Sequence, residues 1–188
     1  MKRRIYLYHP ELPPEMVPLL ESLSENIHLE RKESNLMVLF DADYYNEEPL
    51  DMEEFLLLLM EDFEMNFTLY LEPYSEEDFL LSNDIIPFLS ELPPKLYYLD
   101  DIITYAVLRH NEPLKEAIKA YVLSKANADV IHTVREFIEN NMNSSVSAKK
   151  LYMHRNTLNY RIDNFIEATH INVKTFKGAT AIYMLYKY

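Results

Sequence analysis

The stretch Ser145–Ile162 holds the residues whose types and spacing could do chemistry. It places Lys149 and Lys150 a few residues ahead of a polar segment that contains Arg155 and Asn156. An asparagine side chain can make two hydrogen bonds to an adenine edge, and arginine can do the same with guanine or bind phosphate. These residue types in one short stretch therefore point to contacts with double-stranded DNA.

Two short helices joined by a tight turn would position these side chains. The stretch has the length of a helix-turn-helix, roughly 20 residues. Ala148 lies where the first helix must meet the second, and a small side chain is needed at such a contact. The apolar residues predicted to lock the two helices, or to continue the buried stripe of the second one, are Ala148, Leu151, Met153, Leu158, Ile162 and Phe165.

The opposite face of the second helix is polar. It carries Asn156, Asn159 and Tyr160, with Arg155 and Arg161 on its flanks. The lysines at 149 and 150 lie on the first helix, which in such motifs crosses the phosphate backbone. Two residues depart from the pattern. Tyr152 stands where many such motifs have glycine, and Asp163 on the outer face is unfavourable beside DNA unless a cation pairs with it.

The run His154-Arg-Asn-Thr-Leu-Asn-Tyr-Arg-Ile162 resembles the C-terminal DNA-binding domain of PucR/CdaR-type bacterial transcriptional regulators. An aromatic residue at the position of Tyr152 is normal in that family. The resemblance reaches back to Thr133–Phe137 and forward to the last helix, about a third of the chain, and it does not specify an operator. It implies a sequence-specific regulator, and the predicted DNA-binding residues are Lys149, Lys150, His154, Arg155, Asn156, Thr157, Asn159, Tyr160 and Arg161.

A weaker resemblance concerns the first part of the chain. Several of these regulators carry a degenerate GGDEF domain, related to nucleotide cyclases, before the helix-turn-helix. Here Lys32–Leu36, ahead of the strand-like run Met37–Phe40, occupies the place of that signature. Both glycines and the matching carboxylates are missing, so the resemblance implies a catalytically inactive relative with no cofactor.

The residue pattern of the first hundred residues alternates between strand and helix. The expected order is β-α-β-β-α-β with a further short strand, as in ferredoxin-like α+β sandwiches. The predicted strands are Ile5–Tyr8, Ile27–Glu33, Leu36–Asp41, Phe67–Leu71 and Leu96–Leu99. The predicted helices are Glu15–Ser24, Asp51–Asp62, with Asp51 as cap and Phe55, Leu58 and Leu59 on its apolar side, and Ser75–Leu89 with a capping-box-like start.

Only helices are expected from Asp100 onward. The predicted buried stripes are Ile102, Ile103, Ala106 and Val107; Leu114, Ile118, Tyr121 and Val122; Val130, Val134, Phe137 and Ile138; and Ala179, Ile182, Tyr183 and Tyr186. Ser144 or Ser145 is expected to cap a short helix, and the last helix is expected to begin near Thr175. We therefore predict an α/β domain at 1–99, a helical connector at 100–126 and a helix-turn-helix domain at 127–188.

Charge and proline content divide the chain in a similar way. Residues 1–125 hold 10 basic and 26 acidic side chains, whereas residues 126–188 hold eight basic and five acidic ones. All 10 prolines lie at or before Pro113. Such asymmetry is typical of two modules with different partners.

Composition excludes several classes of function. The absence of cysteine excludes disulfides and thiolate chemistry, and a single glycine excludes glycine-rich phosphate loops. The six histidines show no metal-ligand spacing, so we expect neither a metal site nor enzymatic activity. No signal peptide or membrane-spanning run is expected, which makes a cytoplasmic location the default.

Two hypotheses from different classes remain. The first is a DNA-binding transcriptional regulator, expected to be a homodimer with the helices at 100–125 as candidates for the contact. The second is a non-catalytic interaction or ligand-sensing module that has lost DNA binding, which the overall charge of −13 favours. On the second reading, the run from His154 to Thr157 is mere capping. For Arg161 in particular, a structural role fits as well as a contact with DNA.

Overall fold

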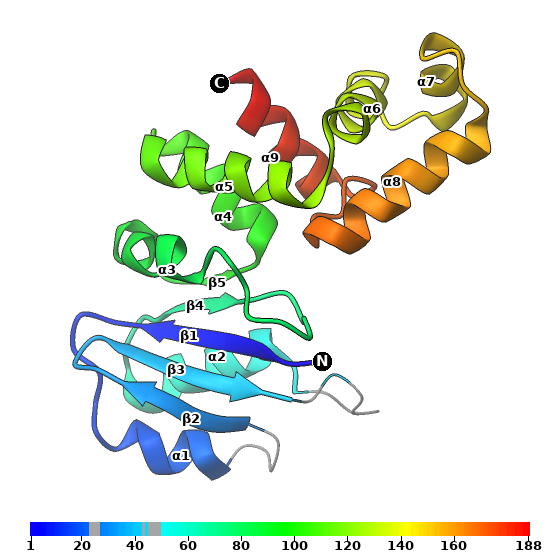
Figure 1. The fold of residues 1–188 in the computed structure, drawn as a ribbon. Helices are drawn as coiled ribbons and strands as arrows, with labels where there is room; N and C mark the ends of the chain where they lie inside the picture. The colour runs from blue at the N-terminus through cyan, green and yellow to red at the C-terminus, as the bar shows by residue number, and fades with distance from the viewer. Residues whose placement is uncertain (23–26, 43, 45–49) are drawn as a thin grey trace. The chain divides into compact units, whose positions relative to one another are not determined.

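The computed structural model describes residues 1–22, 27–42, 44 and 50–188 (Figure 1). The chain divides into two compact units, Met1–Tyr98 and Leu99–Tyr188. The segment predicted as a connector, 100–126, lies within the second unit. A separate role for that segment stays a prediction.

A five-stranded mixed sheet forms the centre of the first unit. Its spatial order is β2-β3-β1-β4-β5; the β2–β3, β1–β3 and β1–β4 pairs are antiparallel, and β5 runs parallel to β4. The strands are β1 (Arg3–Tyr8), β2 (Ile27–Lys32), β3 (Leu36–Asp41), β4 (Thr68–Leu71) and β5 (Leu96–Tyr97). The predicted α+β class and β-α-β-β-α-β order are confirmed. The resemblance of this unit to a degenerate GGDEF domain stays a prediction.

Two helices, α1 (Met16–Ser22) and α2 (Met52–Phe63), pack on one face of the sheet (Figure 1). Successive side chains of a strand point to opposite faces of the sheet, so every second residue of each strand faces these two helices. Asp51 caps α2 as predicted, since its carboxylate accepts hydrogen bonds from the backbone N–H groups of Glu53 and Glu54. The apolar residues of this core include Ile5, Leu7, Met37, Leu39, Leu69 and Leu71 from the sheet and Met16, Leu20, Phe55 and Leu59 from the helices.

One buried position predicted in these two helices is wrong, and one predicted helix end lies outside the described residues. Leu58 was expected inside but is 51% exposed, because the buried stripe of α2 is Met52, Phe55, Leu56 and Leu59. That set follows the i, i+3, i+4, i+7 spacing of one helix face, and Leu58 does not belong to it. The expected end of the first helix at Ser24 lies outside the described residues.

The predicted helix at Ser75–Leu89 is wrong in its start, because residues 75–81 are not helical. Ser75 instead pairs with Lys2 through two backbone hydrogen bonds of 2.8 and 2.9 Å, so the chain is bridged to the start of the sheet here rather than helical. Helical structure begins only with α3 (Ser82–Ile85), which continues as the 3₁₀ helix η2 (Ile86–Glu91). Pro87 prevents a regular α-helix over this range, because its ring clashes with the preceding turn and it has no N–H to donate.

A buried carboxylate ties α3 to the second face of the sheet. Glu72 accepts hydrogen bonds from the Tyr6 hydroxyl at 2.7 Å, from the Arg4 backbone N–H at 3.2 Å and from the Ser82 hydroxyl. Burial raises the pKa of Glu72 above its ordinary value. The three donors offset the cost of burying this polar group.

The second unit is entirely helical. Its helices are α4 (Leu99–Leu108), α5 (Glu112–Lys125), α6 (Ala128–Glu139), α7 (Ser144–Lys150), α8 (Arg155–Thr169) and α9 (Phe176–Lys187). Helix α4 packs on α9, α5 packs on α8, and α6 packs on α8 and α9. None of the helices in the described part of the chain is long and apolar enough to cross a membrane.

The predicted stripes on α4 and α5 are buried within this unit. They are therefore unavailable as a contact between two copies, which corrects the expectation for 100–125. In the apolar stripes predicted for α6 and α9, Val134, Phe137, Ala179 and Ile182 are buried. The other four members, Val130, Ile138, Tyr183 and Tyr186, are half-buried.

Three helices of this unit end in a Schellman motif without glycine. In this motif the residue after the C-cap adopts a left-handed conformation, which glycine tolerates best. Here His110, Asn141 and Tyr152 take that place, with φ of 55°, 54° and 52°. The backbone hydrogen bonds that define the motif are present at all three ends, at the carbonyls of Ala106 and Val107, Phe137 and Ile138, and Ala148 and Lys149.

Candidate nucleic-acid interface

Helices α7 and α8 form the predicted helix-turn-helix. The side chains of Ala148, Leu158, Ile162 and Phe165 are 4% exposed or less. They pack α8 against both α7 and α6, so the polar face of α8 is left outside. Leu151 and Met153 in the turn are half-buried. The arrangement expected from the apolar spacing is confirmed.

Each helix of the motif begins with a side-chain cap. Asn143 caps α7 by accepting from the backbone N–H groups of Ser145 and Val146, so the predicted cap at Ser144 or Ser145 is wrong. The reason is that an Asn at this place satisfies two free N–H groups, and the helix starts at Ser144 itself. His154 caps α8, since its Nδ1 accepts from the backbone N–H of Asn156 at 3.2 Å. This leaves Nε2 of His154 as the ring atom available to a ligand.

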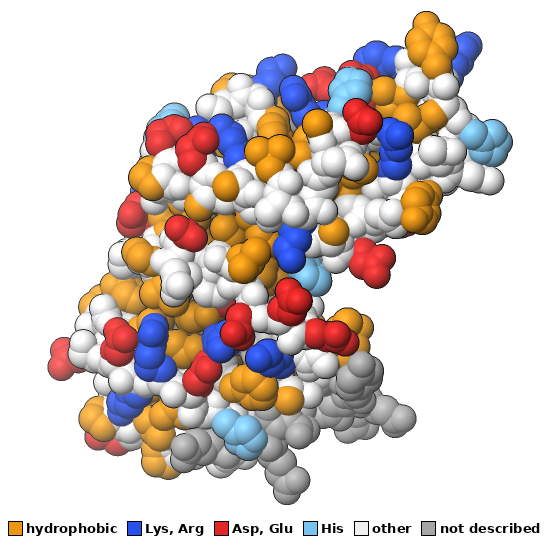
Figure 2. Space-filling model, in the orientation of Figure 1, with side chains coloured by type: hydrophobic (Ala, Val, Ile, Leu, Met, Phe, Trp, Pro, Cys, Tyr) orange, Lys and Arg blue, Asp and Glu red, His pale blue; other side chains and the backbone are white. Residues whose placement is uncertain are grey.

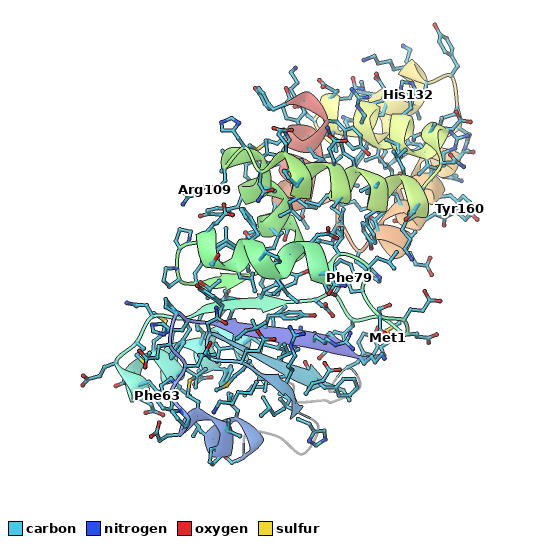
Figure 3. The ribbon with its side chains drawn as sticks, turned by 60° about the vertical axis from the view of Figure 1, so that its left-hand side comes forward. Met1, Phe63, Phe79, Arg109, His132 and Tyr160 are labelled. Atoms are coloured by element: carbon cyan, nitrogen blue, oxygen red, sulfur yellow. The ribbon has the colours of Figure 1, made fainter. Side chains whose placement is uncertain are left out.

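The first turns of α8 present the predicted reading residues to the outside. Arg155, Asn156 and Thr157 are exposed, and Asn159 is half-buried. Tyr160 is 66% exposed, and Figure 3 shows it at the outer margin of the unit. The geometry thus brings a guanidinium, an amide and a phenol together on one helix end, and the first two can each make paired hydrogen bonds to a base edge in the major groove.

Arg161 points the other way. Its Nη1 donates to the Thr133 hydroxyl on α6 at 3.0 Å, and the residue is half-buried. The Thr133 hydroxyl is fully buried and itself donates to the Asp129 carbonyl at 2.7 Å. Arg161 therefore fixes α8 against α6 in the free protein, and any contact of its own with DNA stays a prediction.

We expect Thr133→Val to lower the free energy of unfolding by about 1–2 kcal/mol, because the guanidinium of Arg161 then loses its partner in a half-buried place. Urea denaturation measures this change. The matched control is Thr104→Val on α4, whose hydroxyl bonds the Asp100 carbonyl four residues back in the same way. Equal losses in the two variants would show that the bond to Arg161 contributes nothing.

Ion pairs neutralise part of the positive charge around the motif. Lys150 on α7 pairs with Glu136 on α6 at 2.8 Å, and this contact lowers the pKa of the Glu136 carboxyl. Lys174 pairs with Asp163 on α8 at 2.5 Å, so the unfavourable carboxylate noted from the sequence has its cation. Figure 2 shows acidic side chains among the basic ones of this unit.

Lys149 and Arg155 are the cations of the motif best placed to meet DNA. Both are exposed, and neither has an acidic partner within 4 Å among the described residues. They lie on either side of the turn, one near the end of α7 and one at the start of α8. Together they supply the local positive charge that DNA binding needs on an otherwise acidic protein.

The sequence model described as the PucR C-terminal helix-turn-helix domain matches residues 130–187. Residues 130–187 are a PucR-type helix-turn-helix domain. This domain begins within α6 and runs through α9, so it contains the whole motif and the helices that position it. The resemblance stated from the run His154–Ile162 is confirmed.

Two proteins of Bacillus subtilis (strain 168) are similar to part of the chain. The uncharacterized protein YxkF is 45% identical over 67 residues, which are 36% of this chain and 23% of YxkF. The proline-responsive transcriptional activator PutR is 30% identical over 84 residues, 42% of this chain and 20% of PutR. The matches thus span less than a quarter of either relative.

One solved structure resembles the chain over most of its length. It is the crystal structure of a regulator of polyketide synthase expression from Bifidobacterium adolescentis. The TM-score is 0.48 with 17% sequence identity, over 98% of this chain and 78% of that one.

Proposed function

We propose that this protein is a sequence-specific, DNA-binding transcriptional regulator, and that α8 of its PucR-type domain reads the major groove. The observation that carries the proposal is the exposed pair Arg155 and Asn156 at the start of a helix whose other face is locked in the core. The similarity to a transcriptional activator supports it. Lys149, Lys150, His154, Thr157, Asn159 and Tyr160 are the further proposed contacts.

The roles follow from the position of each residue. Arg155 and Asn156 face base edges, and Asn159 and Tyr160 lie one turn further along the same helix. Lys149 and Lys150 at the end of α7 contact phosphates, which orients the domain but carries no sequence information. Arg161 acts through α6 as a positioning residue. We propose no enzymatic role, because PutR, which shares the helix-turn-helix region, is named as a transcriptional activator.

The protein is further proposed to act as a homodimer in the cytoplasm, where the chromosome lies. One helix-turn-helix covers one half-site, and such regulators usually read two half-sites about 34 Å apart. The contact between copies does not use the stripes of α4 and α5, since these are buried within one unit. Sedimentation at tens of micromolar, with and without DNA, tests the dimer.

Selection of genomic DNA fragments by the purified chain tests the main proposal. Recovery of a common sequence, bound more tightly than random fragments of equal length, is the expected result. If no fragment is enriched and no complex forms even at low salt, the domain has lost DNA binding. The chain would then be an interaction or sensing module on the same fold.

The salt dependence of DNA binding gives a second test of the proposed function. We expect Lys149→Ala to weaken binding to selected and random DNA alike and to reduce the slope of log K against log salt by about 0.9 for each phosphate that is no longer neutralised. Lys125→Ala at the end of α5 is the control, because it removes the same charge from an exposed position outside the motif. An unchanged slope for Lys149→Ala would remove this lysine from the interface.

A further inference from the structure

The turn of the motif holds a tyrosine in the backbone conformation that glycine tolerates best. Tyr152 follows the C-cap of α7 with φ of 52°. Its N–H donates to the Lys149 carbonyl at 3.3 Å, and the N–H of Met153 donates to the Ala148 carbonyl at 3.0 Å. These are the two hydrogen bonds of a Schellman motif, so the turn fixes this conformation. A side chain with a Cβ atom is strained there.

A left-handed residue other than glycine is not unusual in this chain, so the backbone alone does not single out Tyr152. Among the residues that the structure describes, five more non-glycine residues have positive φ. Four of them, Glu64, His110, Asn141 and His170, are exposed and polar, and the fifth, Met142, is half-buried. In each of these the side chain is either solvated or packed.

Tyr152 differs because its large ring contacts almost nothing. It is 98% exposed, the highest value among the exposed large hydrophobic residues that the structure describes, and Phe176 follows at 79%. The free protein therefore carries both the strain of the backbone and an uncovered aromatic ring. Neither stabilises the fold. A single exposed aromatic residue is ordinary on a protein surface, so it is the place of this ring within the motif that links it to a partner.

The place of the ring points to DNA as the partner. Tyr152 lies between the end of α7, which carries the exposed Lys149, and the first residue of α8, Arg155. Lys149 is proposed to meet a phosphate, and Arg155 begins the helix that is proposed to enter the groove. Tyrosine hydroxyls are common donors to phosphate and sugar oxygens in protein–DNA complexes.

Resting on the proposed function, we propose that Tyr152 is a DNA-backbone contact. Its hydroxyl donates to a phosphate oxygen beside the groove that α8 enters, and its ring covers the adjoining deoxyribose. The contact carries no base information, so it adds to the affinity for every sequence. It also explains why the turn keeps an aromatic residue where glycine would relieve strain.

The test is Tyr152→Gly, which should move stability and affinity in opposite directions. Relief of the left-handed strain should raise the melting temperature by about 2–4 °C. Without the tyrosine side chain, binding to selected and random DNA should weaken about tenfold. Tyr152→Phe keeps the ring and should show an intermediate decrease in affinity with no rise in melting temperature.

His110→Gly provides the matched control. His110 is exposed and takes the same place in the Schellman motif that ends α4, with φ of 55°. Its N–H donates to the Val107 carbonyl at 3.1 Å, and the N–H of Asn111 donates to the Ala106 carbonyl at 2.9 Å. It lies outside the helix-turn-helix. This variant should gain a similar rise in melting temperature and bind DNA as the wild type does.

The outcomes separate this inference from the proposed function. If the wild type binds DNA and Tyr152→Gly binds it equally well, Tyr152 is no contact although the regulator function stands. If the wild type selects no DNA, both fail. If Tyr152→Gly converts a dimer to a monomer in sedimentation, the ring is covered by a second copy and the proposed contact with DNA is overturned.

Discussion

Replacing Asn156 by alanine is expected to weaken binding to the selected operator by about 1–3 kcal/mol, roughly a 5- to 150-fold rise in Kd. The side chain is exposed on the first turn of α8, and its backbone N–H is already held by His154. The amide is therefore free to pair with a base edge without unmaking the helix cap. Affinity for random DNA should hardly change, because the hydrogen bonds of this amide are specific to one base pair.

Asn164→Ala is the matched control for this variant. Asn164 is an exposed asparagine on the same helix, eight positions further from the turn and outside the proposed contacts. Fluorescence anisotropy with the selected operator and with a scrambled duplex measures both variants. If Asn156→Ala folds normally and keeps the wild-type discrimination between the two duplexes, α8 does not read bases through Asn156.

The largest expected effect on stability is that of Gly178→Ala. A Cβ atom at this place would lie 2.2 Å from the backbone oxygen of Asn172 and 2.6 Å from its carbonyl carbon. Backbone atoms cannot move away from a clash as the flexible end of a side chain can, so α9 or the preceding loop must shift. We expect a decrease of about 1–3 kcal/mol or more in the free energy of unfolding.

The sign of the change in the free energy of unfolding distinguishes a close backbone contact at Gly178 from an ordinary helix position. Within a helix, glycine to alanine ordinarily stabilises by about 1 kcal/mol through helix propensity. Urea denaturation of Gly178→Ala and of the neighbouring Lys177→Ala, an exposed position whose ion pair with Asp101 spans 3.6 Å, measures the difference. A stabilised Gly178→Ala protein would show that α9 does not approach Asn172 so closely.

The single glycine thus has a use that its rarity alone does not reveal. The sequence shows that Gly178 is the only one, and the positive-φ positions that usually require glycine are filled by other residues. What makes Gly178 necessary is the close approach of a backbone segment six residues earlier. Such an approach depends on how the loop before α9 folds back, which local patterns do not encode.

The pattern of apolar residues was sufficient for most of the elements and for the motif. Residues three and four apart share a helix face whatever surrounds them, so Leu158, Ile162 and Phe165 could be placed inside from spacing alone. Strand alternation and the cap at Asp51 are likewise local, and they predicted the order of the first unit. The helix expected at Ser75–Leu89 failed because pairing with Lys2 and the proline at 87 outweighed a capping signal.

Tertiary contacts decided which charged residues of the motif remain available. Arg161 and Arg155 are equivalent by type, yet one bonds Thr133 on α6 and the other is exposed. Lys149 and Lys150 are neighbours, yet only Lys150 meets Glu136. The sequence by itself determined that a helix-turn-helix with basic and amide side chains is present. Which of those side chains can reach a ligand was set by partners distant in the chain, because hydrogen bonds and ion pairs depend on distances in space that only the packed helices fix.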